Sequence, residues 1–373
     1  MNKLMIYGSM GTFPGIIALA FCDQANLFAV PALHRKDDRM PQPSYAYGVA
    51  RVRVLETKLL SRDRIERMAD APSAGDVLKI LAETSYAPLV SELSSPYDYE
   101  EMLTREMKRV REFIDEISPD PDMVGLFFLK YDFHNLKVML KSMYSGSEND
   151  ALALSDMGTV PIEVLKAGLE AEENKTLPRF MGDAVGQIKE MFTLRIDPQK
   201  IDIVLDRAMY DHIFGVCRRK RNSFVTQYFK KQVDLVNLRS LLRAKRLGED
   251  FEFLKRLLIP YGDLDIAYFA NAIDQPYESI ISTLEYTPYG KLAAEGIQDF
   301  LRSGNLTAFE RLMDNYLLEY VRAGKHNPFG IEAIAGYLLG KENEIKLIRI
   351  IMVGKLNNMP AERIRERLRD VYV

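Results

Sequence analysis

The sequence of 373 residues contains few of the side chains that build covalent or metal-bound scaffolds. It has two cysteines, Cys22 and Cys217, which stand far apart, and four histidines isolated from one another and from the cysteines. Neither cysteine belongs to a C-x-x-C pair. The spacing therefore argues against a disulfide framework and against a zinc site, and the composition fits a reducing compartment.

Motifs of nucleotide binding and of catalysis are also missing. No G-x-x-x-x-G-K-[ST] pattern occurs, and Val353-Gly-Lys-Leu lacks both the upstream glycine and the hydroxyl of a phosphate-binding loop. Metalloprotease, nucleophile-elbow and dinucleotide-binding patterns are absent. We therefore predict no catalytic residue, no cofactor and no metal site, and we expect the chain alone neither to bind nor to hydrolyse ATP.

Charge of one sign and long apolar runs are lacking as well. The 50 basic residues nearly balance the 53 acidic ones, so no global electrostatic argument for nucleic acid exists. The longest apolar stretch, residues 13–22, is shorter than the roughly 20 residues that a membrane span needs. The apolar content of 47% is that of an ordinary globular protein, and the length predicts two or three domains.

Residues 1–43 differ in character from the rest of the chain. They carry few charges before His34 and include a short apolar piece at residues 16–22. One interpretation is a signal peptide in which Lys3 provides the basic region. The favoured interpretation is an atypical extension upstream of a true start near Met40, because no clear cleavage site follows the apolar piece.

From Tyr45 onward, apolar side chains recur at helical spacing. Val49, Val52, Leu55 and Leu59 share one face of the first such segment, and basic and acidic residues occupy the other. Similar segments follow to the C-terminus without convincing period-2 alternation, and prolines stand at helix starts or in loops. The pattern predicts an all-α fold.

An internal repeat organises these helices. Residues 132–137 read Asp-Phe-His-Asn-Leu-Lys, and residues 234–239, 102 positions later, read Asp-Leu-Val-Asn-Leu-Arg. A weaker third copy begins at Glu342, with Ile345 aligned to Leu238. The repeat predicts three similar helical units, residues 44–147, 148–248 and 249–373, which could stack linearly or surround a pseudo-threefold axis.

The repeated polar side chains are the first candidate site. They are Asp132, Asn135 and Lys137 in one copy and Asp234, Asn237 and Arg239 in the next. Positions i and i+3 share a helix face, so each Asp and Asn can point the same way. Two interpretations stay open: a buried polar clamp, which we favour, and a polar ring that lines a central cavity and contacts a partner.

A basic stretch is the second candidate site. Residues 217–247 contain ten basic side chains against one acid, Asp234. Such a stretch is usually a solvated face, but it could oppose an acidic partner or anionic lipid headgroups. Phe224, Tyr228 and Phe229 lie among these charges, and their helical spacing predicts core more simply than a nucleic-acid groove. The candidate contact residues are Arg218, Arg219 and Arg221.

Three segments together resemble a known family. They are Tyr45-Ala-Tyr-Gly-Val-Ala-Arg-Val-Arg-Val-Leu-Glu-Thr-Lys-Leu-Leu-Ser, the Tyr131-Asp-x-x-Asn-Leu-Lys helix with its copy at Asp234, and Glu344-Ile-Lys-Leu-Ile-Arg with the Ile364-Arg-Glu-Arg-Leu end. With the threefold repeat, they resemble the C subunits of V-type (A-type) ATP synthases, the prokaryotic counterparts of the d subunit of eukaryotic V-ATPases. The resemblance covers about residues 44–373, and residues 1–43 depart from it.

The resemblance implies a funnel of three similar helical domains around a pseudo-threefold axis. It also implies a non-catalytic central-stalk protein that couples the stalk to the membrane ring during proton or sodium translocation. The implied partners are the central-stalk subunits and the membrane rotor ring, with no nucleic acid and no small-molecule substrate. The implied location is cytoplasmic and peripheral to the membrane.

Two alternatives from other classes remain at this point. A free-standing helical adaptor or scaffold would have the same composition but would need neither a threefold repeat nor a stalk-sized cavity. An enzyme with a helical active site would need a deep pocket with converging carboxylates, and the sequence contains no constellation that predicts one.

Overall fold

The computed structural model describes residues 44–145, 153–171, 176–192 and 197–373. The expected extension, residues 1–43, lies outside the described residues. Every regular element within these ranges is helical, so the prediction of an all-α fold is confirmed. None of the helices in these ranges is both long and apolar enough to cross a membrane.

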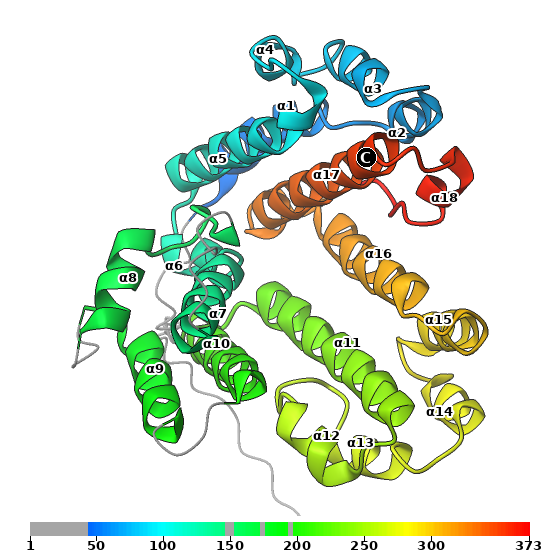
Figure 1. Ribbon diagram of the computed structural model, residues 1–373. Coiled ribbons are helices and arrows are strands. Elements are labelled where there is room, and N and C mark those ends of the chain that lie inside the picture. The colour runs from blue at the N-terminus through cyan, green and yellow to red at the C-terminus, as the bar shows by residue number, and fades with distance from the viewer. Residues whose placement is uncertain (1–43, 146–152, 172–175, 193–196) are drawn as a thin grey trace, which may run out of the picture. The chain divides into compact units, whose positions relative to one another are not determined.

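Figure 1 shows the order of the helices along the chain. In the first part these are α1 (Ala46–Glu56), α2 (Arg62–Asp70), α3 (Ala74–Leu81), α4 (Ala87–Val90), the 3-10 helix η1 (Pro96–Asp98), α5 (Tyr99–Ile117) and α6 (Pro121–Gly125). The middle contains α7 (Leu129–Ser145), α8 (Ile162–Glu170), α9 (Arg179–Phe192), α10 (Pro198–Lys220) and α11 (Ser223–Leu247). The last part contains α12 (Phe251–Leu257), α13 (Ile266–Ala272), α14 (Tyr277–Leu284), α15 (Gly290–Ser303), α16 (Thr307–Gly324), α17 (Glu332–Leu356) and α18 (Ala361–Arg365).

Local signals in the sequence set where many of these helices begin. The side chains of Asp120, Asp197, Asn222 and Asp250 each accept a hydrogen bond from a backbone N–H in the first helical turn. Such N-caps satisfy donors that have no partner within the helix. Gly248 ends α11 in the left-handed conformation, with φ of 72°, which glycine adopts at little cost.

The long helices pack against one another in succession. Helix α10 contacts α7 and α11, α11 contacts α16, and α16 contacts α17. Helix α17 also packs against α1, α2, α3 and α5, so the C-terminal part of the chain lies beside its first helices (Figure 1). The described residues from 44 onward form one compact unit, and the subdivision into residues 44–147, 148–248 and 249–373 stays a prediction.

The C-terminal segment fixes α1 to α17. The Tyr372 side chain is 3% exposed, and its hydroxyl donates a hydrogen bond of 2.9 Å to Oε1 of the buried Glu56 in α1. Its ring lies so close to Gly336 and Gly340 of α17 that a methyl group at either glycine would overlap it. The two glycines therefore form a notch for an aromatic ring that comes from the end of the chain.

Removing this ring tests how much the closure of the chain contributes to stability. We expect Tyr372→Ala to lower the free energy of unfolding by about 3–5 kcal/mol, the usual cost of truncating a buried aromatic side chain. Urea unfolding followed by circular dichroism measures it. Tyr97, which is 73% exposed, provides the matched control, and Tyr97→Ala should change stability by no more than about 0.5 kcal/mol. Equal effects of the two substitutions would contradict the proposed notch.

Candidate functional site

Asp132 on α7 holds the segment that leads into α8. Its side chain is fully buried and accepts hydrogen bonds from Thr159 N at 2.8 Å, Thr159 Oγ1 at 2.7 Å and Val160 N at 3.0 Å. Asn135, also fully buried, exchanges two hydrogen bonds with the backbone of Ser155, at 2.7 and 2.8 Å. The pair therefore supplies hydrogen-bond partners to the backbone of the segment before α8 and joins that segment to α7.

The second copy on α11 makes equivalent bonds to the segment before α13. Asp234 accepts from the backbone N–H groups of Asp263 and Leu264, both at 3.0 Å, and from the Tyr289 hydroxyl at 2.7 Å. Asn237 exchanges bonds of 2.9 and 3.0 Å with the backbone of Ile259. The two copies, which lie 102 residues apart in the sequence, thus form the same arrangement. We call this arrangement the carboxylate clamp.

The third copy, on α17, clamps the segment between α1 and α2. Glu344 accepts from the backbone N–H of Leu60 at 2.5 Å, just before α2, and from the Tyr86 hydroxyl at 2.9 Å. In the alignment of the copies, Lys341 replaces the aspartate, and it lies 3.0 Å from Glu106 and 2.7 Å from Glu344. The clamp recurs with a different set of charges, because Lys341 forms ion pairs with two buried acids, and Arg109 also pairs with one of them, Glu106.

Burial sets the proton affinity of these groups. Desolvation raises the pKa of Asp132 and of Asp234, and hydrogen bonds from the backbone oppose that rise. Desolvation alone would lower the pKa of Lys341, but the charges of Glu344 and Glu106 outweigh it and raise the pKa. The complete burial of Asp132, Asn135, Asp234 and Asn237 favours the clamp interpretation over a contact with a partner.

Lys137 and Arg239, the last members of the repeated set, are half-buried ion-pair partners. Lys137 bonds to Asp206 of α10 at 2.5 Å, and Arg239 lies 3.7 Å from Glu310 of α16. Each therefore joins its repeated helix to the next long helix. Their contact with a partner protein stays a prediction.

Many side chains of the basic stretch are paired within this chain, which its composition does not indicate. Several of its members engage acids or carbonyls of this chain: Lys220 with Asp120 and Asp122, Lys230 with Asp263, Arg243 with Glu310, and Lys245 with the carbonyls of Ile273 and Gln275. Tyr228 and Phe229 are buried, as their helical spacing predicted, whereas Phe224 is only partly buried and stacks on Tyr320. Arg218, Arg219 and Arg221 are exposed at the C-terminal end of α10, where cations complement the helix dipole.

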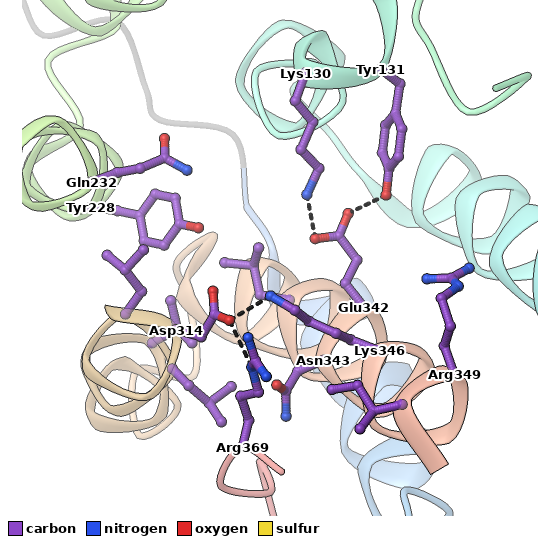
Figure 2. Close-up of a pocket in the computed structure, with 15 residues that line it drawn as sticks. Lys130, Tyr131, Tyr228, Gln232, Asp314, Glu342, Asn343, Lys346, Arg349 and Arg369 are labelled. Atoms are coloured by element: carbon purple, nitrogen blue, oxygen red, sulfur yellow. Dashed lines mark hydrogen bonds and ion pairs between the residues drawn. The ribbon is translucent and has the colours of Figure 1, made fainter. Parts of the chain in front are cut away.

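The structure adds a site that the sequence did not predict. Helices α7, α11, α16 and α17 and the C-terminal segment line a cavity of about 550 Å³ that is partly open to solvent (Figure 2). Lys130 and Tyr131 of α7 both donate to Glu342 of α17. Lys346 of α17 and Arg369 of the C-terminal segment both bond to one oxygen of Asp314 on α16. We call this the central cavity.

The central cavity combines charged side chains with apolar ones. Arg349 also lines it and forms two hydrogen bonds, of 2.7 and 2.9 Å, with Glu100 of α5. Burial and the Glu342 charge raise the pKa of Tyr131, so this hydroxyl stays a donor. The cavity thus places N–H and O–H donors beside apolar side chains. The apolar lining comes from Leu317, Leu318, Val321, Leu339 and Ile350.

The sequence contained only a partial signal for this site. Lys130 and Tyr131 directly precede the repeated Asp132, and Glu342 and Lys346 lie one helical turn apart in the third copy. The other charged residues, Asp314 and Arg369, belong to segments without a recognised motif. Their convergence depends on helix packing that spacing along the chain does not encode.

Comparisons with known proteins agree on one family. A family model described as the ATP synthase (C/AC39) subunit matches residues 48–367. The C subunit of the V-type sodium ATPase of Enterococcus hirae is 26% identical over 321 residues, which cover 86% of this chain and 97% of the relative. The C subunit of the A-type ATP synthase of Methanocaldococcus jannaschii is 26% identical over 344 residues, which cover 87% and 86%, and that of Thermococcus kodakarensis is similar at 26% over 341 residues, which cover 88% and 91%.

Two glycines test the carboxylate clamp. A methyl group at Gly158 or Gly262 would overlap the carboxylate of Asp132 or Asp234, respectively. We expect Gly158→Ala and Gly262→Ala each to lower the free energy of unfolding by about 1–3 kcal/mol, because the clamp must shift to accept the extra atoms.

Gly215 in α10 serves as the control for thermal or urea unfolding of these variants. A methyl group there would meet nothing nearer than 3.8 Å, so Gly215→Ala should leave stability unchanged or raise it by up to about 1 kcal/mol. Unchanged stability of both Gly158→Ala and Gly262→Ala would show that the loops do not need this close approach.

Proposed function

Because the chain belongs to the ATP synthase C/AC39 subunit family, we propose that it is the non-catalytic central-stalk component that joins the stalk to the ion-carrying membrane ring. The match over residues 48–367 is the observation that carries the proposal. The relatives from Enterococcus hirae and Methanocaldococcus jannaschii are named as subunits of an ATPase and of an ATP synthase, and membership of a rotary ATPase complex follows from the family.

A coupling subunit has to transmit torque without yielding. Moving one charge through 100 mV supplies about 2.3 kcal/mol, and this energy must pass through the body of the protein. The three carboxylate clamps and the contacts of α17 with α1, α5 and α16 support such a role, because they join distant segments of the chain, the clamps through hydrogen bonds to buried carboxylates. The proposed subunit performs no bond chemistry of its own.

Two surfaces are proposed for the partners. The central cavity is polar and open enough to receive part of the stalk, which makes it the proposed socket. The exposed Arg218, Arg219 and Arg221 form the proposed charged contact with the stalk or the ring. The protein would then rest on the cytoplasmic face of the membrane through protein contacts, while the ring determines whether protons or sodium ions are carried.

Removing the protein tests the proposed coupling. We expect membrane vesicles that contain the complex without this chain to lose ATP-driven ion uptake, because rotation of the stalk no longer reaches the ring. ATP hydrolysis by the catalytic head should persist. Adding back the purified chain should restore uptake, whereas uptake that is unchanged without the chain would refute the coupling role.

Charge reversal tests the proposed basic contact. We expect Arg218→Glu, Arg219→Glu and Arg221→Glu combined to weaken co-purification with the stalk or the ring while helicity by circular dichroism stays intact, since exposed charges contribute little to folding. The matched control reverses Arg179, Arg302 and Arg363, whose side chains are 95%, 82% and 70% exposed on other helices. Full assembly of the first triple variant would place the contact elsewhere.

A further inference from the structure

The charges that line the central cavity are unevenly matched. Four basic side chains line it, those of Lys130, Lys346, Arg349 and Arg369, against the two acids Asp314 and Glu342. The whole protein, by contrast, has a net charge of −3. Counting Glu100, which binds Arg349 from α5, the four basic groups face three acids, so the cavity keeps one excess positive charge in a slightly acidic protein.

Each acid of the cavity is already shared between two donors. Glu342 accepts hydrogen bonds from Lys130 and Tyr131, and Asp314 accepts them from Lys346 and Arg369 (Figure 2). An ammonium group has three N–H donors and a guanidinium group has five, so the basic side chains retain donors that these acids do not use. The cavity therefore presents mainly positively charged N–H donors to a group that enters it.

The position of Arg369 is fixed before any partner arrives. Its side chain is only 10% exposed. The backbone N–H and the backbone carbonyl of the neighbouring Asp370 are both hydrogen-bonded. Asn315 accepts a hydrogen bond of 2.9 Å from the N–H of Asp370, and Asn343 donates one of 2.7 Å to its carbonyl. A binding group that is already ordered loses little conformational entropy on association.

The volume of the central cavity shows how large a segment of a partner it can accept. One turn of an α-helix with its side chains fills roughly 500 Å³, from a diameter of 10–12 Å and a pitch of 5.4 Å. The central cavity of about 550 Å³ therefore matches about one turn of a single helix, or a loop of similar bulk. The apolar side chains of Leu317, Leu339 and Ile350 can cover aliphatic groups of that segment.

We propose that the central cavity binds one carboxylate-bearing helix end or loop of the central stalk, and that Lys346 and Arg369 are the residues that hold its acidic side chains. This inference rests on the proposed function and adds the chemistry of the partner segment. Charge-assisted bonds from ammonium and guanidinium groups to carboxylates are among the stronger hydrogen bonds in proteins. Asp314 acts as the internal acid that keeps both basic groups in place until the stalk enters.

Two sets of substitutions with opposite expected effects test this. The probe is the purified central-stalk subunits of the same complex, and the readout is their affinity for the full chain at ionic strengths of about 0.05 and 0.5 M, which differ strongly in screening. Lys346→Gln with Arg369→Gln should weaken binding about tenfold at the lower ionic strength and reduce its salt dependence. Asp314→Asn should tighten binding about threefold, because it removes the competing internal acid.

Controls separate loss of charge from loss of structure. Arg179→Gln with Arg302→Gln removes two exposed charges elsewhere and should leave the affinity within about twofold. Circular dichroism and thermal unfolding report whether each variant is folded. If Lys346→Gln with Arg369→Gln does not fold, the Asp314→Asn arm still decides, since weaker or unchanged binding there overturns the inference.

The outcomes also distinguish this inference from the proposed function. Tight binding of the stalk that neither the glutamine pair nor Asp314→Asn alters would overturn the acidic-segment inference and leave the proposed function standing. Failure of the unaltered chain to bind the stalk would refute both the inference and the proposed function. Binding to vesicles of phosphatidylglycerol and phosphatidylcholine that disappears in the glutamine pair would assign the cavity to a lipid headgroup and overturn the inference.

Discussion

Backbone N–H groups in the segments before α2, α8 and α13 find their hydrogen-bond acceptors on side chains from another part of the chain. Glu344, Asp132 and Asp234 provide these acceptors from long helices. An unsatisfied buried donor costs about 1–3 kcal/mol, which makes such a carboxylate hard to replace. Desolvation of the carboxylate opposes the gain, and the raised pKa values of Asp132 and Asp234 reflect it. The clamp therefore fixes where each short helix begins relative to its long helix.

The central cavity depends on the same constraint. Glu344, which clamps the segment between α1 and α2, lies on α17 between Glu342 and Lys346, which line the cavity. The clamp bonds α17 to Leu60 and Tyr86, and Tyr372 joins α17 to α1. Arg369 reaches the cavity from the segment that carries Tyr372. A change that loosens the contact of the C-terminal segment with α1 would thus also move the charges in the cavity. This link gives the proposed socket the rigidity that a coupling subunit requires.

The sequence predicted those parts of the structure that have a local signal. Helical spacing gave the all-α fold, and the Asp-x-x-Asn repeat identified the clamp residues of α7 and α11, because both depend on residues within a few turns of one helix. The role of Glu344 could not be predicted, since its partners Leu60 and Tyr86 precede it by 284 and 258 residues. The ion pairs of the basic stretch could not be predicted for the same reason, because acids such as Glu310 and Asp263, which pair with it, come from later segments. The central cavity draws its lining from four helices and the C-terminal segment, and no spacing rule joins them.

An electron cryo-microscopy map of the assembled complex would test the central claim most directly. The account predicts this chain between the stalk and the membrane ring, with density of one stalk segment inside the central cavity and next to Lys346 and Arg369. A map in which the chain lies away from the rotor, or in which the stalk meets another face and leaves the cavity empty, would contradict it.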